Sequence, residues 1–256
     1  MQLPAIPKAV LIDLAGVLYV GELAVPGAVA ALARLRASGL GLHFLTNTTR
    51  SPRSAVVARL QRLGFEIAAA EIHTAALATR DVVAHRGLHP HYLIHPAIAD
   101  EMGPSHPAPD AVVIGDAGPH FTFERLNVAF RLLMKGLPLI AMARNRYFRE
   151  PDGLTLDVGA FVSALEYAAG GRAEVIGKPA SPFFLAALEA LGVAPDATVL
   201  IGDDLHDDIG GAQRVGIPAI LVRTGKYRPA DEVDPDVRPA HVAADFAAAV
   251  DAILCP

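Results

Sequence analysis

The 256-residue sequence has no tryptophan and a single cysteine, Cys255. One cysteine excludes a disulfide within the chain and a cysteine-rich zinc site, so we assign Cys255 no role. Aromatic residues make up only 6% of the chain and hydrophobic residues 52%, so aliphatic side chains must build most of a sizeable core. The length allows one large domain or two small ones.

Basic charge and long apolar runs are also lacking. The net charge of −5 argues against a nucleic-acid-binding surface, which is normally basic. No apolar run is long enough to span a membrane, and Asp13 interrupts the run at residues 9–20, which favours a buried strand over a signal sequence. We therefore expect a cytoplasmic protein with no nucleic-acid and no membrane partner.

Strand-like and helix-like segments alternate along the chain. Short apolar runs predict strands at residues 9–14, 41–46, 91–95, 111–115, 138–143, 174–176, 198–202 and 218–222. Helical periodicity covers residues 25–38, Ser51-Pro52 and Ser181-Pro182 open two further helices, and the alanine-rich residues 243–252 predict another. This alternation predicts an α/β fold, with a parallel sheet covered by helices on both faces.

Polar residues follow four of the predicted strands, at the edge where such sheets bind ligands. They are Asp13, Thr46-Asn47, Lys178 and Asp203-Asp204. The long stretch between the second and third has strand and helix signals of its own, and structureless loops of that length are uncommon. We therefore predict an inserted domain at residues 81–175, with residues 1–80 and 176–256 forming the other domain.

The strongest of these signals is an acidic cluster. Asp203, Asp204, Asp207 and Asp208 place four carboxylates within six residues. Like charges so close raise each other's pKa, and a hard cation such as Mg²⁺ would relieve the repulsion. The alternative is a solvated acidic turn in which Asp207 or a neighbour caps a helix. Asp13 can ligate a cation with one oxygen and attack phosphorus with the other, or it can cap a turn.

The remaining signals are weaker when taken singly. Gly16 and its neighbours can offer backbone N–H groups to phosphate oxygens. Thr46 and Asn47 offer hydroxyl and amide groups, although both residue types are common in turns. Lys178 is not the lysine of a phosphate-binding Walker A loop, because Pro179 follows it, and a lone lysine is normally solvated.

Taken in order, these residues resemble the four motifs of the haloacid dehalogenase (HAD) phosphohydrolase superfamily. The motifs are Asp, Thr-Asn, Lys and Gly-Asp-Asp-x-x-x-Asp, each after a predicted strand, and the resemblance spans the whole chain. The insertion between the second and third motifs looks like the C2-type α/β cap of the NagD-like subfamily IIA. Residues 202–214 and 222–232 resemble most the phospholysine phosphohistidine inorganic pyrophosphate phosphatase group.

The resemblance implies a Rossmann-like core with an inserted α/β cap, a Mg²⁺ cofactor and an aspartyl-phosphate formed on Asp13. The metal ligands that it implies are Asp13, the backbone oxygen of Ala15, Asp203, Asp208 acting through water, and Asp204 as an additional candidate. The phosphoryl-binding residues that it implies are Gly16, Thr46, Asn47 and Lys178, the last also neutralising the charge of Asp13. The expected substrate is a small phosphorylated molecule or a phospho-amino acid. The resemblance also suggests that the chain can self-associate as a homodimer.

Ala15 departs from the family pattern. Most HAD phosphatases carry there a second aspartate that acts as general acid and then as base, worth about 10²–10⁴-fold in rate. The phospholysine phosphatase type carries serine, and phosphonate-cleaving relatives carry alanine. A phosphatase with Ala15 should therefore favour phosphoramidates, pyrophosphate and activated esters over alkyl monoesters, with water, Glu22 or Tyr19 as the base.

Two other functions compete with this phosphatase. The loss of the acid suits a catalytically weakened module that binds phosphate or a phosphoprotein. It also suits a phosphonate hydrolase, which needs a cap lysine, and Lys135 is the only lysine in residues 81–175.

Two further groups of residues have two interpretations each. Six of the ten histidines lie in the segment from His85 to His120. They could form a metal site, but we favour the interpretation that they are scattered over turns. Residues 144–147 (Arg-Asn-Arg-Tyr), Arg223 and Lys226 either contact substrate or form solvated basic turns.

Overall fold

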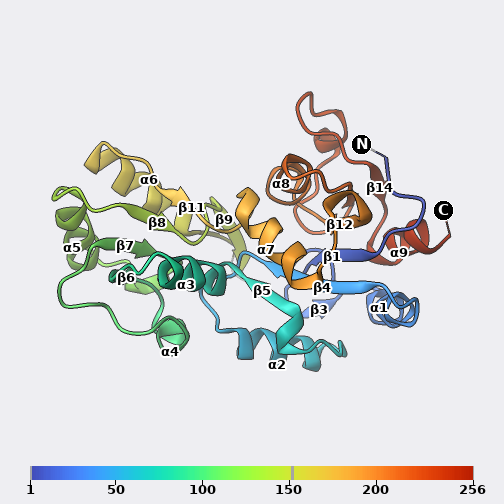
Figure 1. The fold of residues 1–256 in the computed structure, drawn as a ribbon, viewed down its shortest axis with the longest axis horizontal. Helices are drawn as coiled ribbons and strands as arrows, with labels where there is room; N and C mark the ends of the chain where they lie inside the picture. The colour runs from blue at the N-terminus through green and yellow to red at the C-terminus, as the bar shows by residue number, and fades with distance from the viewer. Residues whose placement is uncertain (1, 151–152, 256) are drawn as a thin grey trace. The chain divides into compact units, whose positions relative to one another are not determined.

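The computed structural model describes residues 2–150 and 153–255 (Figure 1). They divide into two compact units. The first comprises the described residues of Met1–Thr46, Val57–His73 and Lys178–Pro256, and the second those of Asn47–Val56 and Thr74–Gly177. The predicted insertion at residues 81–175 falls within the second unit, which begins earlier and also takes in residues 47–56.

A six-stranded sheet forms the centre of the first unit, in the order β14-β13-β12-β1-β4-β5. The strands are β1 (Ala9–Asp13), β4 (Gly41–Thr46), β5 (Ile72–Thr74), β12 (Thr198–Gly202), β13 (Ala219–Val222) and β14 (His241–Ala243). β1 pairs in parallel with β12 on one side and β4 on the other, placing Ile12 beside Ile201 and Asp13 beside Leu45. Every residue of β1 is buried, as expected of a strand covered on both faces.

Helices of the first unit pack in two pairs. The helices are α1 (Ala28–Ala37), α7 (Ser181–Leu191), α8 (Gly211–Arg214) and α9 (Phe246–Leu254), and α2 (Arg53–Arg62) begins in the other unit. α1 packs against α9, as Figure 1 shows, and α7 packs against α8. The chain steps from β1 through α1 to β4 in one direction and from β12 through α8 to β13 in the other. Right-handed crossovers therefore put α1 and α8 on opposite faces, and the strand order reverses between β1 and β12.

The second unit has a four-stranded parallel sheet, in the order β11-β8-β7-β6, and a separate hairpin. Its strands are β6 (Pro90–Leu93), β7 (Ala111–Ile114), β8 (Leu139–Ala141) and β11 (Glu174–Val175), and the hairpin is β9 (Tyr147–Glu150) with β10 (Gly153–Leu156). Its helices are α3 (Ala75–His85), α4 (Ala99–Met102), α5 (Phe123–Leu133) and α6 (Val158–Ala169). Val112, Ile114, Val162 and Leu165 are among the buried residues that join this sheet to its helices.

All eight predicted strands are present, and the α/β fold with a parallel sheet is confirmed. The prediction missed β5, β9, β10 and β14, together with the short pair β2 (Tyr19–Val20) and β3 (Leu23–Ala24). The helix predicted for residues 243–252 was wrong at its start. Ala243 ends β14, and the Asp245 side chain accepts a hydrogen bond from Ala248 N, so α9 begins only at Phe246. Among the described residues, no helix is long and apolar enough to cross a membrane.

Candidate active site

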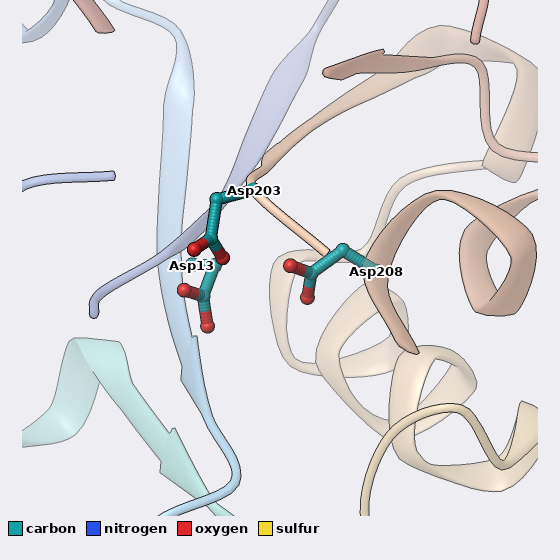
Figure 2. A group of neighbouring side chains, drawn as sticks. All are labelled: Asp13, Asp203 and Asp208. Atoms are coloured by element: carbon teal, nitrogen blue, oxygen red, sulfur yellow. The ribbon is translucent and has the colours of Figure 1, made fainter. Parts of the chain in front are cut away.

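Three buried aspartates converge where the strand order of the first unit reverses (Figure 2). Asp13 ends β1, Asp203 directly follows the neighbouring β12, and Asp208 comes from the π-helical segment η5 (Leu205–Gly210). One oxygen of each carboxylate lies within 4.8 Å of the other two. All three residues are at most 5% exposed, so the fold has taken three acidic groups out of water at one point.

Lys178 is the buried cation of this group. Its Nζ donates to Oδ1 of Asp13 and to Oδ1 of Asp208, the second bond being 2.6 Å long. Oδ2 of Asp208 accepts a bond from the Asp204 backbone N–H at 3.1 Å, so both oxygens of Asp208 have protein partners. The sequence indicated Lys178 only as a single lysine after a predicted strand, and the fold brings its ammonium into contact with two of the predicted aspartates.

Burial dominates the ionisation of this site. Burial raises the pKa of Asp13 to about 7, against the opposing effect of the Lys178 ammonium, and Asp208 raises it further. Burial also raises the pKa of Asp203, and the charges of Asp13 and Asp208 add to the shift. The pKa of Lys178 is raised because the carboxylates of Asp13 and Asp208 outweigh its burial. The site therefore holds more negative charge than its lysine balances.

The other two aspartates of the acidic cluster behave differently. Oδ1 of Asp204 accepts bonds from the backbone N–H groups of His206 and Asp207 at 3.1 and 2.9 Å, so Asp204 caps η5. Its Oδ2 accepts a bond from Lys226 Nζ at 3.1 Å, and Lys226 holds its pKa below the usual value although burial opposes this. Burial raises the pKa of Asp207 to about 6, assisted by Asp204. The predicted cap is therefore a neighbour of Asp207, and among the described residues Asp204 is outside the converging group.

The comparisons with known proteins agree along the whole chain. The family model described as haloacid dehalogenase-like hydrolase matches residues 10–103, and one described as HAD-hydrolase-like matches residues 175–249. Haloacid dehalogenase-like hydrolase domain-containing protein 2 of Bos taurus is 48% identical over 96% of this chain and 96% of its own. The chain belongs to the haloacid dehalogenase-like hydrolase family. Phospholysine phosphohistidine inorganic pyrophosphate phosphatase of Danio rerio is 45% identical, over 96% of this chain and 94% of its own.

Solved structures of the family have the same fold. NagD from Escherichia coli K-12 is 25% identical, with a TM-score of 0.86 over 96% of this chain and 98% of that chain. Glycerol phosphate phosphatase from Mycobacterium tuberculosis, in complex with magnesium, is 28% identical, with a TM-score of 0.86 over 94% of this chain and 76% of that chain. The predicted HAD phosphohydrolase with a NagD-like fold is thereby confirmed at the level of the family.

The donor set of this HAD-like hydrolase fits a hard divalent cation. Three carboxylates converge, two of them bonded to one buried ammonium, and Mg²⁺ takes oxygen ligands of this kind, usually from one or two carboxylates with waters and phosphate oxygens. The residues that could hold it are Asp13 and Asp203, with Asp208 beside them. Ala15, the predicted donor of a backbone oxygen, follows Asp13 by two residues and has an exposed side chain.

The predicted phosphoryl-binding residues of the hydrolase lie in both units. Thr46 is buried at the end of β4 and follows Leu45, the residue paired with Asp13. Asn47 belongs to the second unit, where its Nδ2 donates to Oδ1 of Asn145 at 3.1 Å. The Gly16 N–H donates to the Tyr19 carbonyl oxygen at 2.7 Å, so this amide is engaged within its own loop.

Arg59 engages both side chains predicted as a substitute base. Glu22 accepts a bond from Arg59 Nη2 at 2.8 Å. The Arg59 guanidinium lies 4.6 Å from the centre of the Tyr19 ring, and burial raises the pKa of Tyr19. A phenol with a raised pKa stays protonated at neutral pH, so Tyr19 is not suited to act as a general base.

Two of the basic residues singled out by the sequence, Arg144 and Arg223, have carboxylate partners. Arg144 makes two bonds to the buried Glu166, of 2.8 and 2.6 Å, and Arg223 bonds Glu232 at 2.8 Å. Lys135, required by the phosphonate hydrolase alternative, is exposed just after α5. Among the described residues, some histidine rings meet in pairs, such as His89 with His106, and no histidine joins a group of three metal-binding side chains.

Sequence reasoning missed the glycines that allow the aspartates to converge. A Cβ on Gly202 would lie 2.4 Å from the Cβ of Asp208, so only glycine permits the close approach of η5 to the end of β12. The position of Gly202 before Asp203 was a usable signal, since a glycine at a strand end marks the close approach of another segment. Gly225, which lies against Asp203, gave no such signal because its neighbours come from distant parts of the chain.

Proposed function

We propose that this HAD-like hydrolase is a Mg²⁺-dependent phosphatase that forms an aspartyl-phosphate on Asp13. The observation that supports it is the buried Asp13 carboxylate at the end of β1, bonded to Lys178 and converging with Asp203 and Asp208. The proposed substrate is a small phosphorylated molecule or a phospho-amino acid, and the second unit is the proposed cap. Phosphatases are named among the curated relatives and the solved neighbours, which supports the same class of reaction.

In the proposed reaction, a carboxylate oxygen of Asp13 attacks phosphorus. The bond from phosphorus to the leaving group breaks, and its electron pair departs with the leaving group. Lys178, held by Asp208, offsets negative charge on Asp13 and the phosphoryl group as the new bond forms. Water then attacks phosphorus, the bond to Asp13 breaks, and inorganic phosphate leaves with the carboxylate restored. A bound Mg²⁺ would supply charge neutralisation at the phosphoryl oxygens and favour ionised Asp13.

The leaving group decides which substrates suit this site. The exposed Ala15 carries no acid, and Glu22 and Tyr19 are engaged by Arg59. A leaving group must therefore depart without a strong proton donor. Phosphoramidates can be protonated on nitrogen beforehand, and pyrophosphate and aryl phosphates leave as weak bases. We therefore infer that these are turned over faster than alkyl monoesters such as sugar phosphates.

A substrate panel tests the proposal. The purified protein is assayed with Mg²⁺ on an aryl phosphate, pyrophosphate, a phosphoramidate and a sugar phosphate, with Asp13→Asn as the control variant. We expect activity that chelation removes and Mg²⁺ restores, and none in Asp13→Asn. Activity that survives in Asp13→Asn would contradict the mechanism. Phosphate binding without turnover of any substrate would favour a binding module.

A further inference from the structure

The loop after β13, residues 224–226 (Thr-Gly-Lys), contacts two separate parts of the aspartate site. The backbone N–H of Lys226 donates to Oδ2 of Asp203 at 2.7 Å. The hydroxyl of Thr224 donates to the carbonyl oxygen of Gly16, in the loop that follows Asp13. One short loop therefore joins the segment after β1 to the carboxylate at the end of β12, although nearly 200 residues separate the two in sequence.

Two glycines enclose the Asp203 carboxylate. A Cβ built on Gly225 would lie 2.0 Å from Oδ2 of Asp203 and 2.5 Å from the Cα of Gly16. A Cβ built on Gly16 would lie 1.9 Å from the same oxygen. Both glycines also have positive φ, of 60° and 92°. The Asp203 carboxylate thus lies between the backbones of Gly16 and Gly225, and a side chain on either glycine would displace it.

The side chain of Lys226 adds a charge to this arrangement. Its ammonium bonds Oδ2 of Asp204 at 3.1 Å, while its backbone N–H holds Asp203. Arg223, three residues earlier, instead bonds Glu232. The lysine is thus the member of this basic pair that faces the acidic cluster.

We propose that the positioning loop, residues 224–226 acting with Gly16, fixes the Asp203 carboxylate in the orientation that binds the divalent cation. The inference rests on the proposed Mg²⁺ site and deepens it by naming the residues that set its affinity. Gly225 lies against Asp203, and Thr224 acts on it through Gly16, so both are positioning residues. Loss of groups that orient a metal ligand typically weakens metal binding by about 10–100-fold.

Glycine substitutions separate crowding from backbone strain. Gly225→Ala places a methyl group against Asp203 at a φ of 60°, whereas the control Gly192→Ala, at a φ of 65°, has no atom within 4 Å of its new Cβ. Titration calorimetry on the metal-free proteins measures Mg²⁺ binding directly, without an activity assay. We expect Gly225→Ala to bind Mg²⁺ about 10–100-fold more weakly than wild type and Gly192→Ala to bind as wild type. Equal weakening in both would show that strain alone is responsible and overturn the proposal.

The threonine provides a second test if Gly225→Ala does not fold. Thr224→Val keeps the shape but removes the hydroxyl donor to Gly16, and Thr224→Ser restores it. We expect the valine variant to need a higher Mg²⁺ concentration for half-maximal activity and to bind Mg²⁺ more weakly by calorimetry, with kcat at saturating Mg²⁺ close to wild type. The serine variant should recover wild-type binding. Wild-type binding in Thr224→Val would overturn the proposal.

A further variant separates this inference from the proposed function. Wild-type protein that binds no Mg²⁺, or Asp203→Asn that binds it as tightly as wild type, would refute the metal site and the positioning role together. If wild type binds and Asp203→Asn does not, while Gly225→Ala and Thr224→Val bind normally, only the positioning role fails.

Discussion

Replacing Ala15 by aspartate should change which leaving groups the enzyme tolerates. Ala15 lies two residues beyond Asp13, its side chain is exposed and its φ is negative, so an aspartate fits without crowding or backbone strain. The new carboxylate adds to the excess negative charge of the site, so Ala15→Asp should lower the free energy of unfolding by about 1 kcal/mol, which leaves the protein folded. Any large change in rate would then reflect chemistry at the site.

The size of the change follows from what a positioned acid contributes. A general acid is worth about 10²–10⁴-fold when the leaving group needs a proton, or about 2.7–5.4 kcal/mol of activation free energy. An alkyl phosphate needs that proton, whereas an aryl phosphate leaves as a weak base and gains little. We therefore expect kcat/KM to rise by about 10²-fold or more for a sugar phosphate and by less than about tenfold for 4-nitrophenyl phosphate.

Steady-state kinetics on the two substrates measure this difference. Ala15→Asn is the matched control, because asparagine has the shape of aspartate but no proton to transfer at neutral pH. Ala15→Asn should leave the ratio of the two kcat/KM values as it is in wild type. Equal gains on both substrates in Ala15→Asp, or no gain on either, would refute the leaving-group reasoning.

Two further predictions concern the packing that supports each unit. Glu166→Gln should lower the free energy of unfolding by about 1.5–3 kcal/mol at pH 7, because glutamine lacks the negative charge and its NH2 group cannot accept the second bond from Arg144. Burial alone would raise the pKa of Glu166, but the Ala173 N–H and Arg144 outweigh it and hold that pKa below its usual value. The stabilisation is therefore complete above the usual glutamate pKa and is lost as the pH falls through the lowered pKa. Denaturation curves should show the difference from wild type shrinking in acid, and a constant difference would contradict this. Gly202→Ala should cost about 1–3 kcal/mol in the same assay and lower kcat, since its methyl group would displace Asp208, and unchanged kcat would contradict the contact.

Much of the fold could be predicted because the central strands are buried on both faces. β1, β12 and β13 are continuous apolar runs with turn residues at both ends, a pattern that needs no knowledge of neighbours. The strands that were missed are short or lie at edges, such as β5 and β14 at the two ends of the six-stranded sheet. In those positions fewer residues are buried, so the alternation that reveals a strand is weak.

The residues that form the candidate site could largely be predicted from the sequence, but the contacts that each of them makes could not. Strand ends identified Asp13 and Asp203 because the parallel strands β1 and β12 bring their carboxyl ends to one edge. Lys178 follows β11, which belongs to the sheet of the second unit, so that rule does not account for its place in the site. The division within the acidic cluster, with Asp204 capping η5 and Asp208 bonding Lys178, depends on a π-helical turn that the sequence did not indicate. The part played by residue 226 was equally hidden, since Lys226 reaches Asp203 only after β13 is added beside β12.

The charge of the converging group links its ionisation to its chemistry. Asp13, Asp203 and Asp208 with Lys178 sum to −2 when all are ionised, in a region from which water is largely excluded. Burial, with the charge of Asp208 adding to it, explains why the pKa of Asp13 rises to about 7 although an ammonium touches it, and a protonated Asp13 could not attack phosphorus. A divalent cation would bring the sum to zero and favour the ionised nucleophile. In the proposed mechanism, the same burial that makes the three carboxylates costly to hold without a cation would therefore make the reactivity of Asp13 depend on one.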